Sequence, residues 1–240
     1  MDNPFFSDRS ERLLGKDAIE ILNNSTIAIF GLGGVGSFAT EAIARLGVGT
    51  IIITDFDVVD ITNVNRQLYA LHSTIGKKKT DIAYDRVRDI NPKCNIHKYT
   101  IFVSDQNFNL YDIYQIDCVI DCIDSIESKI SLIEYMNKRG IPVVTSMGAA
   151  NKTDPSAIKT ADIHKTHQCP LAKIVRKGLR ERNVMNNVTA IYSTEAPIKP
   201  STPGPLGSIA TIPSIFGLYC ASSALKILTS HMLPDIYHYK

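Results

Sequence analysis

A glycine-rich turn between a strand-like run and a helix-like run is the strongest constraint that this sequence places on its fold. Residues 25–30 are a short apolar, β-branched run, typical of a strand buried on both faces. Gly31, Gly33 and Gly36 follow directly, and residues 37–46 have helical composition. In this spacing the first glycine makes a tight turn, the second lets the backbone approach phosphate, and the third lets helix pack on strand. The pattern predicts a nucleotide-binding βαβ unit.

The same alternation of strand and helix continues through most of the chain. We expect strands at residues 25–30, 50–55, 95–102, 118–123 and 141–146, and helices at 17–23, 37–46, 78–90 and 128–139. Alternating strands and helices with right-handed crossovers form parallel sheets covered on both faces. The predicted fold class is therefore α/β, with a Rossmann-like, doubly wound, mostly parallel sheet.

The pattern loosens from about residue 150 onward. Two strand-like runs, a helical stretch and a terminal helix are expected there, at 157–163, 188–193, 171–182 and from Gly217. There is neither an internal repeat nor a clear linker. We expect one domain over residues 1–240, in which about 1–150 form a nucleotide-binding, Rossmann-like core and about 151–240 form a substrate-binding or dimer-forming elaboration.

Composition excludes several classes of protein. With 240 residues, 44% of them hydrophobic, the chain is long enough to bury a large core. A net charge of +2 is far from the strongly basic footprint of many nucleic-acid-binding domains. The 5 cysteines are scattered and contain no Cys-x-x-Cys pair, which indicates neither a disulfide framework nor a four-thiolate zinc site. A reducing cytoplasm is the expected location.

One uncharged stretch has the length of a membrane span. Residues 200–225 contain no charged side chain, and that length would cross a bilayer. However, the stretch also holds prolines, glycines, serines and threonines, which are poor lipid-facing material. We therefore expect a loop and a buried C-terminal helix and no integral membrane insertion.

Charged side chains after the glycine turn indicate which nucleotide is bound. Asp55 ends the second predicted strand, where an acid that binds ribose hydroxyls is expected. A dehydrogenase does not need the cations Arg66 and Lys79 downstream of such an acid, nor Asp124 after a later strand. An enzyme that handles a triphosphate and Mg²⁺ needs both, because cations neutralise phosphates and a carboxylate holds the metal.

Taken together, these residues resemble the ubiquitin-activating-enzyme-like adenylyltransferases, a superfamily that includes the molybdopterin and thiamine sulfur-carrier activators. The matching positions are Arg9-x-x-Arg12, the glycine turn, Asp55-Phe56-Asp57, Asn63-x-Asn65-Arg66-Gln67, Lys79 and Asp121-Cys122-Ile123-Asp124, over about residues 9–130. Each position alone has an ordinary structural explanation. Lys77, Lys78 and Lys79 suit a solvated helix start, and Asp121 lies inside its strand. The specificity comes from the set and its order.

The resemblance implies a role for each position. It places ATP at Gly31, Gly33, Gly34 and Gly36, with Asp55 on the ribose hydroxyls and Asp57 and Asn63 among the nucleotide-binding residues. It implies that Arg66 and Lys79 contact the phosphates and that Asp124 binds Mg²⁺. Arg12 is expected near the γ-phosphate, in the partner subunit's site if the protein is a homodimer. Arg12, Arg66, Lys79 and Asp124 are thus the candidate catalytic residues.

Residues 148–230 resemble one branch of that superfamily, the tRNA threonylcarbamoyladenosine dehydratases. The matches are Gly148-Ala149-Ala150, Asp154-Pro155, Asp162-Ile163-x-Lys165-Thr166, Pro170-Leu171-Ala172, Leu179-Arg180-Glu181-Arg182, Tyr192-Ser193-Thr194-Glu195 and the small-residue helix from Gly217. The implied function is ATP-dependent cyclisation of N6-threonylcarbamoyladenosine in tRNA through carboxylate adenylation. The implied partners are that tRNA, a second copy of the chain and, less directly, a sulfur-transfer protein. The sequence does not decide whether a monovalent ion binds near the C-terminal loops.

Two other functions stay open at this point. An activator of a ubiquitin-like or sulfur-carrier protein would adenylate a protein C-terminus, and its thioester-forming relatives need an exposed cysteine. Cys169 alone has a loop context, yet the dehydratase branch usually has Asp there. A metal site is another possible use of this segment. It would have three ligands, His164, His167 and Cys169, and it lacks a fourth. A non-catalytic nucleotide-binding module would bind ATP without releasing pyrophosphate.

A basic stripe gives independent support for an RNA partner. Lys173, Arg176, Lys177 and Arg180 recur on one side of the predicted helix, and residues 173–182 carry a net charge of +4 when Arg182 and Glu181 are included. Such a stripe can hold RNA phosphates in a salt-dependent manner. A solvated helix face is the ordinary explanation of the same pattern.

Overall fold

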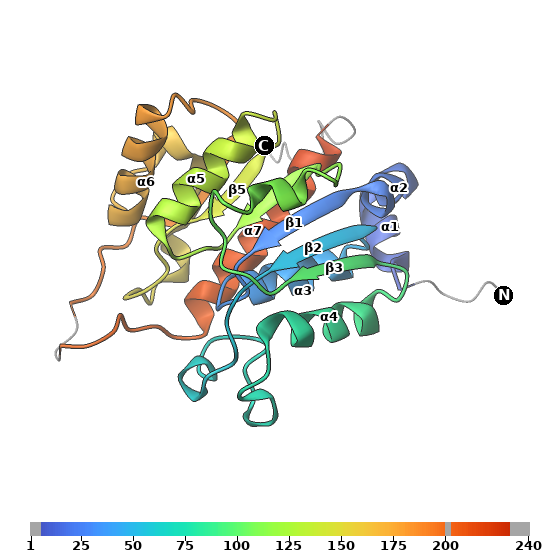
Figure 1. Ribbon diagram of the computed structural model, residues 1–240, viewed down its shortest axis with the longest axis horizontal. Helices are drawn as coiled ribbons and strands as arrows, with labels where there is room; N and C mark the ends of the chain where they lie inside the picture. The colour runs from blue at the N-terminus through green and yellow to red at the C-terminus, as the bar shows by residue number, and fades with distance from the viewer. Residues whose placement is uncertain (1–5, 200–202, 231–240) are drawn as a thin grey trace.

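A seven-stranded sheet runs through the centre of the molecule (Figure 1). The computed structural model describes residues 6–199 and 203–230. The strands are β1 (Thr26–Phe30), β2 (Thr50–Thr54), β3 (Asn95–Tyr99), β4 (Cys118–Asp121), β5 (Val143–Ser146), β6 (Ile158–Asp162) and β7 (Val188–Ser193). Their order is β3-β2-β1-β4-β5-β7-β6; all neighbours are parallel except β6, which is antiparallel to β7. The predicted fold class is confirmed.

Helices cover both faces of this sheet (Figure 1). The described helices are α1 (Asp8–Leu14), α2 (Lys16–Asn24), α3 (Gly36–Arg45), α4 (Lys79–Ile90), α5 (Ile126–Asn137), α6 (Pro170–Glu181) and α7 (Thr211–Thr229), with five short 3-10 helices between them. One apolar layer joins α2, α3, α4 and α7 to the sheet. A second joins α5, α6 and the 3-10 helix Phe108–Tyr111 to the opposite face. Both layers are continuous apolar cores.

Most strands are slightly shorter than predicted, and β4 and β3 end two and three residues earlier than the sequence indicates. The run 118–123 ends as a strand at Asp121, because β1 and β5 pair with β4 only up to that residue. The run 95–102 ends at Tyr99, which pairs with the last residue of β2, Thr54. Helix α1 was not predicted; it has no buried residue and hence no core-facing apolar pattern to detect.

The uncharged C-terminal stretch is explained by burial. Among the described residues, α7 alone is long and apolar enough to cross a membrane. Its Ile212, Phe216 and Cys220 are fully buried in the same core layer as the β1 residues Ile27 and Ile29. An apolar, charge-poor composition is what a helix packed on the centre of a sheet requires.

A buried ion pair joins β4 to α5. Lys129 is completely buried, and its ammonium donates to Asp121 Oδ2 at 2.7 Å, Ser146 O at 3.1 Å and Thr145 Oγ1 at 3.3 Å. These acceptors match the three protons of the ammonium group. Asp121 therefore serves the core by pairing with Lys129. Of the two acids in Asp121-Cys122-Ile123-Asp124, Asp124 remains as the candidate metal ligand.

Candidate nucleotide and substrate site

The glycine turn leaves no room for side chains at two of its positions. Gly31 has a φ of +86°, and a Cβ there would lie 2.7 Å from the Cys122 carbonyl oxygen. A Cβ on Gly36 would lie 1.7 Å from the Gly31 carbonyl oxygen. The turn can thus fold back sharply at the end of β1, and α3 begins directly behind it with its N-terminus toward the site. Such an end attracts anions.

Asp55 ties the end of β2 to this turn. Its Oδ2 accepts the Leu32 backbone N–H at 2.6 Å, and its Oδ1 accepts the Asp57 backbone N–H at 2.8 Å. Burial raises the pKa of the carboxyl group, while the nearby Lys79 ammonium and both backbone donors oppose that rise. The carboxylate is oriented by backbone donors and lies on the wall of the cavity beside the turn.

Lys79 and Asp57 form an ion pair in the same cavity. The Lys79 ammonium lies 2.7 Å from Asp57 Oδ2, and the lysine is nearly completely buried at the start of α4. Lys77 and Lys78 are exposed beside it. The solvated-helix explanation thus fits Lys77 and Lys78 but not Lys79, whose charge faces the interior.

Asn63 ends the short helix Ile61–Asn63, and Arg66 follows it. Arg66 Nη1 donates to the Thr62 carbonyl at 2.7 Å and to Asn65 Oδ1 at 2.9 Å. Asn63 Oδ1 accepts the Asp60 backbone N–H, which caps the helix. Both side chains line the cavity. The contacts fix the Arg66 guanidinium, and no carboxylate of residues 6–199 or 203–230 pairs with it, so its charge is available to a phosphate.

The cavity extends well beyond the nucleotide-binding residues. Its volume is about 830 Å³. We call the lining residues expected to bind ATP its nucleotide half; they are the glycine turn, Asp55, Asp57, Asn63, Arg66, Lys79 and Asp124. We call residues 146–152, 169–171, Ile174, Pro197 and Leu206 its second half. Ser208 and Pro213 adjoin the nucleotide half, because Asn65 donates to the Ser208 carbonyl oxygen at 3.0 Å and Pro213 packs on Gly34. The predicted core and the C-terminal region therefore meet in one cavity. A nucleotide in the first half would face a second ligand in the other.

Asp124 has the properties of a free metal ligand. It follows β4, lines the cavity and is exposed. Its side chain makes no hydrogen bond or ion pair with any residue in 6–199 or 203–230. Oxygen donors of this kind suit Mg²⁺, which retains waters and phosphate oxygens as its other ligands. The donor set at this strand end fits the predicted metal.

Arg12 lies apart from the cavity. Its side chain is 81% exposed on α1, and its guanidinium lies 3.9 Å from Asp8 Oδ2. It is not among the residues that line the cavity. The structure of one chain therefore does not bring Arg12 to the other candidate catalytic residues, and a place for Arg12 in a partner subunit's site stays a prediction.

Cys169 lines the cavity but is not an exposed nucleophile. It is 4% exposed and precedes α6. His164 Nε2 contacts the Val184 carbonyl oxygen at 2.9 Å, and the His167 ring packs edge-on against Tyr192. The two imidazoles thus have separate partners. Within the described part of the chain, no group of three His, Cys, Asp or Glu residues is placed to hold a metal.

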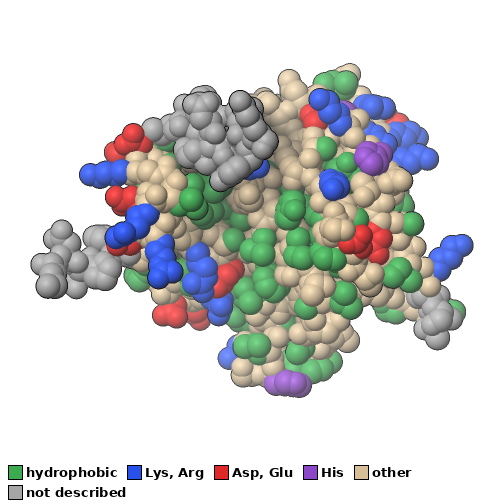
Figure 2. All heavy atoms as spheres, turned by 180° about the vertical axis from the view of Figure 1, so that it is seen from behind, with side chains coloured by type: hydrophobic (Ala, Val, Ile, Leu, Met, Phe, Trp, Pro, Cys, Tyr) green, Lys and Arg blue, Asp and Glu red, His purple; other side chains and the backbone are tan. Residues whose placement is uncertain are grey.

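The basic stripe is less free than its spacing indicates. Lys and Arg side chains do gather at the end of the molecule that carries α6 (Figure 2, upper right). However, the half-buried Arg176 turns inward and donates to the Thr166 carbonyl at 2.6 Å and to Thr166 Oγ1 at 2.7 Å. Lys177 lies 3.7 Å from Glu181. Lys173 and Arg180 are exposed and have no side-chain partner among the described residues.

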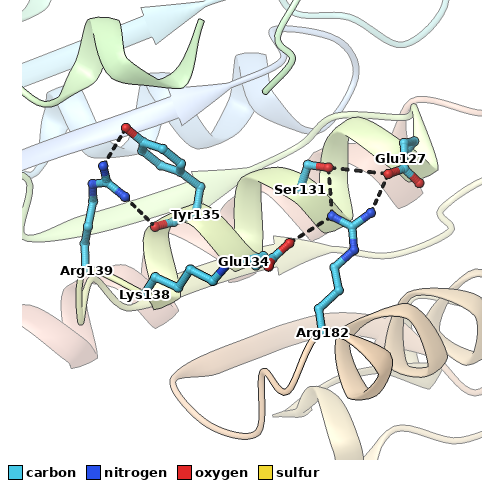
Figure 3. Close-up of polar contacts among 7 residues, drawn as sticks. All are labelled: Glu127, Ser131, Glu134, Tyr135, Lys138, Arg139 and Arg182. Atoms are coloured by element: carbon cyan, nitrogen blue, oxygen red, sulfur yellow. Dashed lines mark hydrogen bonds and ion pairs between the residues drawn. The ribbon is translucent and has the colours of Figure 1, made fainter. Parts of the chain in front are cut away.

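Arg182 is also occupied, at the end of α6. Its guanidinium reaches across to α5, where it donates to Glu127, to Ser131 Oγ at 2.9 Å and to Glu134 Oε2 at 3.0 Å (Figure 3). These contacts hold α6 against α5. Arg176 and Arg182 therefore serve internal contacts and Lys177 is paired, which leaves Lys173 and Arg180 as the stripe cations without a side-chain partner among the described residues. RNA binding by the stripe stays a prediction.

Sequence reasoning missed two side chains of the cavity wall. Phe102 packs on Phe56 with ring centroids 5.1 Å apart, and both rings are about half exposed at the rim. Lys152 is 4% exposed and lines the second half of the cavity. Neither belongs to a periodic run, since Phe102 follows a strand and Lys152 lies in a loop, so no local pattern could single them out.

Comparison with known proteins agrees with this geometry. The chain belongs to the ThiF family, which matches residues 7–239. It is 50% identical to the tRNA threonylcarbamoyladenosine dehydratase of Bacillus subtilis over 190 residues, covering 79% of this chain and 75% of the relative. It is 35% identical to the enzyme of that name from Escherichia coli, with 90% of each chain covered.

Solved structures show the same similarity. The structure of the E. coli tRNA N6-threonylcarbamoyladenosine dehydratase in complex with ATP superimposes with a TM-score of 0.87 at 35% identity and covers 95% of each chain. The AMP complex of that protein gives a TM-score of 0.88, covering 97% of this chain and all of that one. The predicted resemblance to adenylating enzymes of this branch is thus confirmed.

Proposed function

We propose that this protein is an ATP-dependent enzyme that cyclises N6-threonylcarbamoyladenosine in tRNA by adenylating its threonyl carboxylate. The observation that carries the proposal is the single cavity with two halves. One half holds the residues expected to bind ATP, and the other is built by the C-terminal region that resembles the dehydratases. The relatives of that name and the ATP and AMP complexes support the assignment.

The chemistry proceeds in two steps that together remove one water. A threonyl carboxylate oxygen attacks the α-phosphorus of ATP, and the bond to the leaving pyrophosphate breaks. The carbamoyl group of the same modification then attacks the acyl carbon, a carbamoyl N–H proton is lost, and AMP leaves with the former carboxylate oxygen. Because the second nucleophile belongs to the substrate, the enzyme needs no cysteine nucleophile. The burial of Cys169 is compatible with this route.

The chain contributes position and charge. The glycine turn and the N-terminus of α3 receive phosphate, and Asp55 is oriented to accept ribose hydroxyls. Arg66 and Lys79 neutralise charge that develops on the phosphates. Asp124 would hold Mg²⁺, which would polarise phosphate oxygens. Holding carboxylate and α-phosphate in one cavity removes the entropy cost of bringing them together.

We further propose the assembly and location that the resemblance implies. A homodimer would let Arg12 enter the partner subunit's site, since Arg12 lies outside the cavity of its own chain. The seven-stranded sheet takes strands from both halves of the chain, which supports a single domain over 1–240. A cytoplasmic location and a sulfur-transfer protein partner stay predictions.

The direct test uses tRNA that carries the linear modification. The protein is incubated with ATP, Mg²⁺ and this tRNA, and the nucleosides are analysed by mass spectrometry. We expect the modified nucleoside to lose the mass of one water, with AMP and pyrophosphate formed in equal amounts. An unchanged nucleoside would refute the proposal. Pyrophosphate exchange that depends instead on a carrier protein ending in Gly-Gly would favour the carrier-activating alternative.

A further inference from the structure

Lys152 stands out as a buried ammonium group without an ion-pair partner among the described residues. The residue is 4% exposed, and its Nζ donates to the Ser193 carbonyl oxygen at 3.1 Å. It forms no ion pair with a carboxylate of residues 6–199 or 203–230. An ammonium group has three protons to donate. Its one hydrogen bond therefore leaves donor capacity unused, and no carboxylate of the described residues lies within ion-pair distance.

Lys129 shows what a structural buried lysine looks like in this protein. Its ammonium has three acceptors, one of them the Asp121 carboxylate at 2.7 Å. It lies in the core and does not line the cavity, whereas Lys152 does. A buried charge without a paired partner is costly. Where such a charge faces a cavity, a ligand of opposite charge would relieve the cost.

The loop that carries Lys152 is held in place by other groups. Glu195 accepts the backbone N–H groups of Thr153 and Asp154 at 2.9–3.0 Å, so its carboxylate is engaged there. The Asn151 backbone N–H donates to the Gly207 carbonyl oxygen at 2.8 Å, and Asn151 Oδ1 accepts the Gly207 backbone N–H at 2.7 Å, which joins the two loops. The Lys152 backbone is thus fixed at the cavity wall, although its ammonium lacks a carboxylate.

The pKa of Lys152 agrees with this environment. Burial lowers the pKa of its ammonium group, while electrostatic interactions with Cys169 and Glu195 oppose the change. A bound carboxylate beside the ammonium would favour its charged form further.

The distribution of charge in the cavity identifies the ligand that suits Lys152. Among the described residues that line the cavity, Arg66 and Lys79 lie in the nucleotide half, and Lys152 is the cation of the other half. Two anions, the substrate carboxylate and the ATP phosphates, must approach each other during adenylation. A cation on the substrate side would offset the repulsion between them and attract the carboxylate.

We propose that Lys152 binds the carboxylate of the substrate in the second half of the cavity and positions it for attack on ATP. This inference rests on the proposed function and names the residue that selects a carboxylate-bearing substrate there. Lys152 acts before the reaction, by binding, and does not donate or accept a proton in it.

The test compares two ligands that differ only in the carboxylate. Binding of an anticodon stem-loop RNA with the linear modification is measured beside the same RNA with a carboxamide in place of the carboxylate, both with α,β-methylene-ATP present to prevent turnover. In the wild-type protein we expect the carboxylate RNA to bind about tenfold or more tightly, as for hydrogen bonds to charged groups. Lys152→Met should lose this preference, and Lys152→Arg should keep it.

Controls separate binding from folding. Lys159→Met removes an exposed lysine of β6 and should leave the preference unchanged. The affinity for α,β-methylene-ATP should stay the same in Lys152→Met, because Lys152 lies outside the nucleotide half. If Lys152→Met fails to fold, Lys152→Gln keeps a hydrogen-bond donor without the charge on a side chain one atom shorter, and it too should lose the preference.

The outcomes of this test and of the functional test are distinct. If folded Lys152→Met or Lys152→Gln keeps the full preference for the carboxylate, the role of Lys152 is refuted while the proposed function stands. If the wild-type protein converts no modified tRNA, the proposed function itself fails.

Discussion

Gly36 lies so close to Gly31 that a Cβ on Gly36 would be 1.7 Å from the Gly31 carbonyl oxygen. This approach brings the first turn of α3 against the end of β1, and it places the helix N-terminus at the cavity. The spacing of the glycines along the chain is therefore a packing requirement as well as a phosphate-binding pattern.

Gly36→Ala is expected to damage both folding and ATP binding. Because the obstacle is backbone, relief requires α3 to shift, and overpacking of this kind costs about 1–3 kcal/mol or more. Chemical denaturation and ATP titration check both effects. Gly204→Ala is the matched control, since no atom lies within 4 Å of its added Cβ. Equal stability of the two variants would contradict the packing argument.

Asp124→Ala should abolish turnover without destabilising the fold. The side chain has no partner among the described residues, so the free energy of unfolding should change by about 0.5 kcal/mol or less. Pyrophosphate release and thermal denaturation measure the two quantities. Asp105→Ala, another exposed and unpaired acid, should keep activity. Full activity of Asp124→Ala would refute its assignment to Mg²⁺.

Lys129→Met should be strongly destabilising. It would leave Asp121 as a buried carboxylate without its cation, which costs about 3–5 kcal/mol. The control is Lys98→Met, which breaks an exposed ion pair with Asp81 at 2.6 Å and should cost about 0–1 kcal/mol. Urea denaturation measures the free energy of unfolding of both variants. Similar decreases in the two would contradict a larger contribution from the buried pair.

Glu41→Gln should reduce stability in a manner that depends on pH. Burial acts to raise the pKa of Glu41, but contacts with Arg86 and Arg45 outweigh it, so the pKa is lowered in the folded protein. The stabilisation is therefore complete above the unfolded-state pKa of about 4.3 and disappears as the pH falls through the lower folded-state pKa.

The measurement is the difference in free energy of unfolding between wild type and Glu41→Gln at several pH values. The difference should be largest near neutral pH and shrink toward zero in acid. Glu181→Gln, in an exposed pair with Lys177, should show little difference at any pH. A gap between wild type and Glu41→Gln that persists unchanged in acid would contradict the ion-pair explanation.

The α6 cations should separate into two groups when RNA binding is measured. Lys173→Met and Arg180→Met remove unpaired surface charges, so each should weaken tRNA binding and reduce the salt dependence by about one phosphate contact. Arg176→Met should instead lower stability, since Arg176 holds Thr166. Titrations at several salt concentrations test this. A salt slope unchanged in Lys173→Met and Arg180→Met would remove α6 from the RNA-binding surface.

The sequence alone determined the parallel α/β sheet, the glycine turn and the acids and cations expected around ATP. Those features follow from local rules. Buried strands are short apolar runs, and ligands collect where parallel strands end. Gly31, Asp55 and Asp124 are each adjacent in sequence to a recognisable strand, which is why their positions could be predicted.

The tertiary structure decided which side chains face one another. It joined the nucleotide-binding residues to residues 146–152 and 169–171 in one cavity, turned Arg176 inward and kept Arg12 outside. It also left Lys152 buried, with no carboxylate of the described residues in an ion pair with it. The environment of a lone lysine in a loop depends on residues distant in sequence. Whether a charged side chain is buried and which partner it has depend on the folded structure, and these two properties determine its pKa and its availability to a ligand.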